Sequence, residues 1–130
     1  MNNKDLLEQT ANASIAIANA AAEGLRPDGG MVTEKNHATG HVSPRRSWWE
    51  QAESVVGYLN AFELTGDEAY FEKSLRSWEY IKKNFIDRKN GGWYSYVSES
   101  GVPSGDKTGF WICPYHSGRM CMEVLERVKE

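Results

Sequence analysis

The residues best suited to chemistry lie in two short stretches of the chain. Residues 111–119 read Trp-Ile-Cys-Pro-Tyr-His-Ser-Gly-Arg, and residues 48–53 read Trp-Trp-Glu-Gln-Ala-Glu. A histidine can take and give a proton near neutral pH, which makes His116 a candidate general acid or base. Indole rings pack in a core or stack on a flat ligand such as a sugar, and carboxylates accept hydrogen bonds from hydroxyls. The two stretches together favour proton transfer on a small polar molecule.

Four helices are predicted to position these stretches. Helix formers and apolar residues at helical spacing indicate helices over about residues 5–24, 48–64, 68–85 and 115–128. Thr65-Gly66 should end the second helix, and Asp67 should cap the third. The fourth helix should bury a stripe made by Met120, Cys121, Val124, Leu125 and Val128. The second and third helices should form an antiparallel hairpin, which brings the starts of the second and fourth helices to one end.

Two long loops lead into the second and fourth helices. Residues 25–44 are rich in turn residues and hold His37 and His41, which are spaced like a metal pair on a helix. Because Thr39, Gly40 and the following Ser-Pro disfavour a helix there, no metal site is expected. Residues 93–97, with flanking turn residues, indicate a short strand or hairpin before the last helix.

Composition excludes several classes of protein. A length of 130 residues fits one domain, and a net charge of -3 without a basic tract disfavours nucleic acid or anionic membrane as a partner. Residues 11–22 are too short and too polar to span a bilayer, and the N-terminus lacks the apolar core of a signal peptide. We therefore expect a cytoplasmic protein. Two cysteines, Cys113 and Cys121, are too few for a four-ligand zinc site and are expected to be reduced.

Both stretches belong to longer motifs that resemble a known family. Residues 48–57 read Trp-Trp-x-Gln-Ala-Glu-x-Val-Val-Gly, and residues 113–120 read Cys-Pro-Tyr-His-x-Gly-Arg-Met. In this order and spacing they resemble the C-terminal third of cellobiose 2-epimerases, within the N-acylglucosamine 2-epimerase group. The resemblance implies an all-α fold, in which six helical hairpins close an (α/α)6 barrel. Residues 1–130 would form a single partial domain of two hairpins, with a short β-hairpin before the last helix.

The resemblance also implies a reaction. Sugars with glucose- and mannose-type reducing ends, such as cellobiose, would be interconverted by proton transfer at C2, with no metal and no nicotinamide cofactor. His116 would be one of two acid/base histidines, and the other would come from earlier helices of a full chain. The implied substrate-binding residues are Trp48 or Trp49, Glu53 and Trp111, while Arg119 is as consistent with a salt bridge as with a sugar contact. The isolated chain is then expected to be inactive.

Other interpretations stay open at this point. The same aromatic residues could serve a carbohydrate-binding or interaction module without catalysis. A fragment of a six-hairpin glycoside hydrolase would need two carboxylates on opposite sides of the scissile bond. Glu50 and Glu53 imitate such a pair, but their spacing on one helix disfavours opposed attack. A partial barrel would also leave apolar helix faces uncovered, so self-association is expected.

Overall fold

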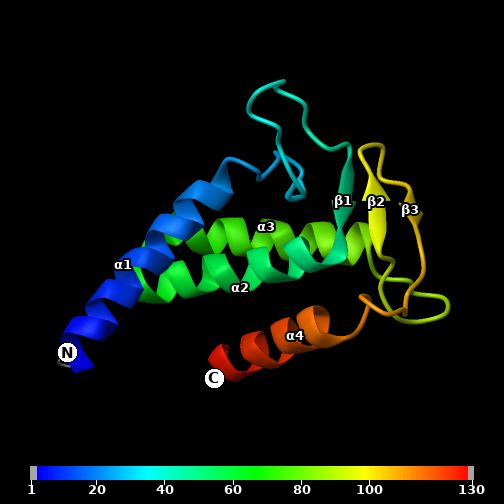
Figure 1. Cartoon of the computed structure of the whole chain (residues 1–130). Helices are drawn as coiled ribbons and strands as arrows, with labels where there is room; N and C mark the ends of the chain where they lie inside the picture. The colour runs from blue at the N-terminus through cyan, green and yellow to red at the C-terminus, as the bar shows by residue number, and fades with distance from the viewer. Residues whose placement is uncertain (1–2, 129–130) are drawn as a thin grey trace.

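The computed structural model describes residues 3–128 and consists of four helices and a small antiparallel sheet (Figure 1). The elements follow in the order α1 (Asn3–Ala22), β1 (Arg45–Ser47), α2 (Trp48–Thr65), α3 (Glu68–Asn84), β2 (Tyr96–Ser98), β3 (Pro103–Ser104) and α4 (Tyr115–Arg127). The predicted helices are confirmed, with ends that differ by a few residues. No helix within residues 3–128 has the length and apolarity to cross a membrane.

Helix α2 is central, because α1, α3 and α4 all pack against it. It ends at Gly66, whose left-handed backbone (φ 70°) suits glycine and lets its N–H donate to the Phe62 carbonyl. Asp67 then begins α3 by accepting a hydrogen bond from the Ala69 N–H at 2.9 Å. The predicted antiparallel hairpin of α2 and α3 follows from these two residues, and Figure 1 shows the two helices side by side.

Two apolar clusters hold the helices together. The larger lies where α2, α3, α4 and β2 meet, and its buried members are Trp48, Ala52, Val55, Val56, Tyr80, Ile81, Phe85, Val97 and Met120. The smaller joins α1 to the other end of the hairpin through Ala18, Met31, Tyr58, Ala61 and Tyr70. Burying these side chains supplies the main stabilisation of the hairpin. The start of α2 therefore belongs to a well-packed part of the molecule.

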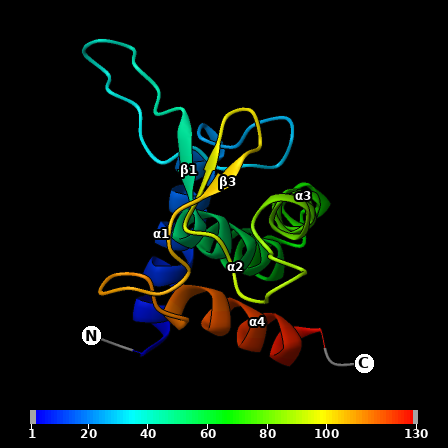
Figure 2. The same ribbon diagram turned by 90° about the vertical axis from the view of Figure 1, so that its right-hand side faces the viewer.

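The predicted hairpin is part of a three-stranded sheet, in which β2 pairs with β1 on one side and β3 on the other. Strand β1 was not predicted, because Arg45–Ser47 is short and polar and becomes a strand only by pairing with Tyr96–Ser98. The guanidinium of Arg45 lies 3.9 Å from the centre of the Tyr96 ring across this pairing. Figure 2 shows the strands standing at the end where α2 begins.

The predicted buried stripe of α4 is wrong in part. Met120 is buried and Val124 packs against the core, but Cys121, Leu125 and Val128 are exposed. The reason is that α4 packs on α2, and no described helix covers its outer side. These three residues instead line an open groove toward α3.

Candidate functional site

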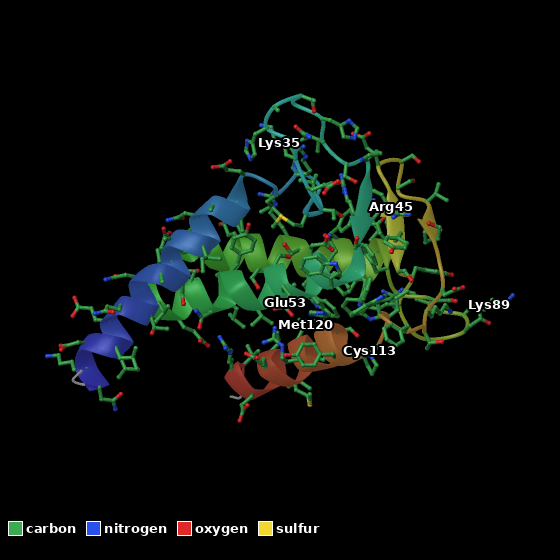
Figure 3. All side chains as sticks on the ribbon, viewed as in Figure 1. Lys35, Arg45, Glu53, Lys89, Cys113 and Met120 are labelled. Carbon is green, nitrogen blue, oxygen red and sulfur yellow. The ribbon has the colours of Figure 1, made fainter. Side chains whose placement is uncertain are left out.

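His116 and Glu53 face each other across the α2–α4 contact. Nδ1 of His116 lies 2.8 Å from Oε1 of Glu53, although 63 residues separate them in the sequence. Figure 3 labels Glu53 on α2 and Met120 on α4, which face each other across the contact of the two helices. Because an ionised carboxylate only accepts hydrogen bonds, Nδ1 of His116 carries the hydrogen. Nε2 then keeps its lone pair, as a general base requires.

The second oxygen of Glu53 is also occupied. Oε2 accepts a hydrogen bond from Nη2 of Arg119, one turn along α4 from His116. Burial alone would raise the pKa of Glu53, but the hydrogen bonds from Arg119 and then His116 outweigh it and hold the pKa below its ordinary value. Glu53 is therefore an anion at neutral pH and orients the His116 ring.

Aromatic rings surround the imidazole. Tyr115 and Trp48 meet the His116 ring edge-on, with ring centres 5.1 and 6.4 Å away, and Trp49 lies tilted at 5.9 Å. Trp48 is 7% exposed and belongs to the core, whereas Trp49 is 41% exposed. Of the two neighbouring tryptophans, Trp49 is the one open to a ligand.

An open cavity of about 380 Å³ adjoins this pair, between α1 and α2. Trp49, Glu50 and Glu53 line it on the α2 side, and Ile17, Ala18 and Met31 are among its apolar lining residues. Its size fits a small molecule. Trp49 and Glu53 both line the cavity and contact the imidazole, whereas His116 itself is not one of the lining residues.

Glu50 is buried at 7% exposure, and neither carboxylate oxygen has a hydrogen-bond partner among residues 3–128 within ordinary bonding geometry. Burial raises the pKa of Glu50, while the nearby hydroxyls of Thr33 and Ser47 and the charge of His116 oppose the rise. Gln51 of the same motif has a structural role, because its amide accepts from the Met31 N–H at 2.7 Å and donates to the Met31 carbonyl at 2.8 Å.

Trp111 lies apart from the rings around His116. Gly109 and Ile112 exchange backbone hydrogen bonds, so Phe110 and Trp111 form the tip of a tight turn. The two rings pack edge-on with centres 5.0 Å apart, and Trp111 is 82% exposed. The loop is anchored further back, where Lys107 forms an ion pair with the buried carboxylate of Asp87.

The structure thus brings together His116, Glu53, Arg119, Trp48 and Trp49, and leaves Trp111 at a loop tip. His37 and His41 lie on the loop as predicted, and no three His, Cys, Asp or Glu side chains within the described part of the chain form a metal-binding group. Sequence reasoning missed Glu123, which binds Arg119 at 2.8 Å and Arg127 at 2.7 Å. Its spacing of four residues from each arginine on α4 was the available signal.

Comparison with known proteins identifies the class to which this fold and site belong. A model of the N-acylglucosamine 2-epimerase (GlcNAc 2-epimerase) family matches residues 1–117. The chain therefore belongs to the N-acylglucosamine 2-epimerase family. This is a family of sugar epimerases and isomerases. The similar solved structures confirm the predicted fold class of a partial (α/α)6 barrel.

Cellobiose 2-epimerases are among the similar proteins. The enzyme of Bacteroides fragilis is 49% identical over 111 residues, which are 84% of this chain and 28% of that protein. The enzyme of Ruminococcus albus is 39% identical over 98% of this chain and 33% of its own length. A crystal structure of a sugar epimerase from a ruminal bacterium superposes with a TM-score of 0.89 at 38% identity, over 98% of this chain and 33% of that one. The chain spans about one third of the length of these relatives.

Proposed function

We propose that this chain provides one half of the catalytic centre of a sugar 2-epimerase acting on cellobiose-like sugars. The observation that supports it is the contact between Nδ1 of His116 and Oε1 of Glu53 at 2.8 Å, beside the cavity that Glu53 and Trp49 line. Five curated cellobiose 2-epimerases share between 32% and 49% identity with the chain. The names of these proteins support the substrate class.

The proposed chemistry is proton transfer at C2 of an opened reducing-end sugar. Nε2 of His116 takes or returns the proton on one face of C2, and a second acid/base group acts on the other face. Glu53 stabilises the imidazolium that forms, because its carboxylate already accepts the Nδ1 hydrogen. Inversion at C2 requires this second group opposite His116, and we assign it to a part of the enzyme outside this chain. The isolated chain is then inactive.

Substrate binding is assigned to Trp49, which adjoins the imidazole, and to Trp111 at the loop tip. Trp49, a residue that is 41% exposed, lies beside the His116 ring, and Trp111, which is 82% exposed, lies at the loop tip. An indole face stacks on the apolar face of a sugar ring. Trp48 packs beneath His116 and supports it. Arg119 acts on Glu53, because its guanidinium already binds two carboxylates.

The experiment uses a chimera, in which residues 1–130 replace the matching third of the Ruminococcus albus relative. With cellobiose in heavy water, we expect deuterium at C2 of the reducing glucose, and loss of this exchange in His116→Ala. His41→Ala, on the loop, serves as the matched control and should retain exchange. A folded chimera that still exchanges with His116→Ala would contradict the proposal, whereas sugar binding without any exchange would favour a binding module. Exchange by the isolated chain would refute its proposed inactivity.

We also propose that the isolated chain self-associates with a second copy. An apolar groove of about 440 Å³ between α3 and α4 is lined by Phe71, Leu75, Trp78 and Leu125, among other residues, and has no covering element within residues 3–128. In a solution of this chain alone, another copy is the available apolar partner. Light scattering during size-exclusion chromatography should report oligomers, with a shift toward monomer in Leu125→Glu. Met122→Glu, exposed on α4 outside the groove, is the control; a monomeric wild-type chain would exclude this association.

A further inference from the structure

The ion pairs at His116 continue along the contact between α2 and α4. Glu53 binds Arg119, Arg119 binds Glu123, Glu123 binds Arg127, and Arg127 binds Glu63 back on α2. We call this series the charge ladder. The pairs beyond Glu53 measure 2.8, 2.7 and 2.9 Å. Carboxylates and guanidinium groups alternate from the imidazole toward the far end of α4.

Glu123 has a particular place in the charge ladder, because its two oxygens bind two different arginines. Oε1 accepts from Nη1 of Arg119, and Oε2 accepts from Nη2 of Arg127. The three residues are spaced at i, i+4 and i+8 on α4, so they lie on one face of the helix. Their side chains are between 24% and 32% exposed, which makes them half-buried and less screened than pairs in open solvent.

Arg119 depends on Glu123 for its orientation. Its Nη1 binds Glu123 and its Nη2 binds Glu53, while Nε is buried without a partner within the described residues. The hydrogen bonds that set the plane of the guanidinium therefore come from two carboxylates, and the Tyr115 ring, with its centre 5.8 Å from the guanidinium carbon, adds a weaker contact. Loss of one carboxylate would free the group to rotate and would leave its charge less compensated.

We propose that Glu123 is a positioning residue for His116, acting through Arg119 and Glu53. Glu123 fixes Arg119, Arg119 fixes Oε2 of Glu53, and Glu53 then presents Oε1 to the Nδ1 hydrogen of the imidazole. The inference rests on the proposed acid/base function of His116, since a defined tautomer matters only for an imidazole that must keep Nε2 free. Glu123 touches neither His116 nor the cavity in the described residues.

The test measures the tautomer of His116 by ¹⁵N chemical shifts of its ring, in the 130-residue chain without any sugar. This readout separates the inference from the proposed enzyme function, which is tested by deuterium exchange. In the wild-type chain the Nδ1–H form should dominate. Glu123→Gln should lower the ratio of Nδ1–H to Nε2–H about two- to fivefold, which is the effect expected of a half-exposed ion pair. A merely structural residue would change stability without changing this ratio.

Glu126→Gln is the matched control, because Glu126 is exposed on the same helix and lies outside the charge ladder. It should leave the ratio unchanged. Arg127→Gln is the second variant, which keeps the inference testable if Glu123→Gln fails to fold; it removes the outer partner of Glu123 and should shift the ratio in the same direction. An unchanged ratio in either folded charge-ladder variant, or an equal change in Glu126→Gln, would overturn the inference.

Discussion

Glu50 and Glu53 stand three residues apart on α2, and their carboxylates have opposite electrostatic surroundings. Glu53 binds Arg119 and His116, whereas Glu50 is buried with neither oxygen hydrogen-bonded among residues 3–128. The pKa of Glu53 is lowered and that of Glu50 is raised, although burial acts on both. The two residues should therefore change the pH dependence of stability in opposite directions.

Glu53→Gln should lower the free energy of unfolding at pH 7 by about 1 kcal/mol, allowing for solvent screening of a one-third exposed group. Because the pKa of Glu53 is lowered in the folded state, the ionised carboxylate stabilises the fold at pH values above the ordinary pKa of 4.5. This stabilisation is lost as the pH falls through the folded-state pKa. Urea denaturation at pH 7 and pH 3 should show a deficit that is larger at pH 7 than at pH 3. An equal deficit at both pH values would contradict the assigned ion pairs.

Glu50→Gln should have the reverse effect and raise the melting temperature at pH 7 by about 3 °C. Burial raises the pKa of Glu50 above 4.5, so the wild-type chain loses stability as pH rises from 4.5 through the folded pKa. Calorimetry between pH 4 and pH 7 should show the gain growing with pH. Glu72→Gln, at an exposed position of α3, is the control, and a gain independent of pH would refute the electrostatic cause.

Asp87→Asn should loosen the loop that carries Phe110 and Trp111. Asp87 is buried, and the hydrogen bond from Lys107, followed by those from Asn90, holds its pKa far below the ordinary value. Without the charge, Lys107 loses its ion-pair partner and keeps its hydrogen bond to the Gly91 carbonyl, so residues 105–112 should exchange their amide hydrogens faster. Asp106→Asn, exposed in the same loop, should leave the rates near wild type. Unchanged exchange in Asp87→Asn would show that other contacts hold the loop.

Asp67→Ala should cost about 1 kcal/mol in the free energy of unfolding, because the cap of α3 is lost. Asp67→Asn keeps an oxygen that accepts from the Ala69 N–H and should retain most of the stability. Chemical denaturation of the two variants side by side measures the difference. Equal losses in both would mean that the charge of Asp67, rather than its hydrogen bond, stabilises the helix.

The sequence predicts the α2–α3 hairpin well, because helical periodicity, Gly66 and Asp67 all act locally. It predicts β1 poorly, since Arg45–Ser47 becomes a strand only through a partner 50 residues away. The exposed side of α4 was also missed, because helical periodicity marks an apolar face without telling what covers it. Leu125, at 71% exposure, illustrates this limit.

For the site, the prediction that α2 and α4 begin at the same end of the molecule was sufficient to predict that His116 lies near Glu53. The separation of Trp48 from Trp49 into a buried and an open ring follows from their directions around a helix. The part played by Glu123 could not be derived, because regularly spaced charges on a helix are usually solvated. The pair of Arg119 and Glu123 is joined to His116 only because Glu53, on the neighbouring helix, also binds Arg119.

Because of the charge ladder, the packing of α4 on α2 should depend on ionic strength. Met120 is the buried apolar residue by which α4 enters the core, Val124 and the His116 ring add apolar and aromatic contacts, and ion pairs join α4 to α2 along its length. Dissolved salt weakens half-exposed ion pairs, with a Debye length of about 8 Å at physiological concentration, and leaves the apolar contact largely intact. Dissolved salt should therefore weaken the ion pairs that orient the His116 ring, even without a salt ion bound near the ring.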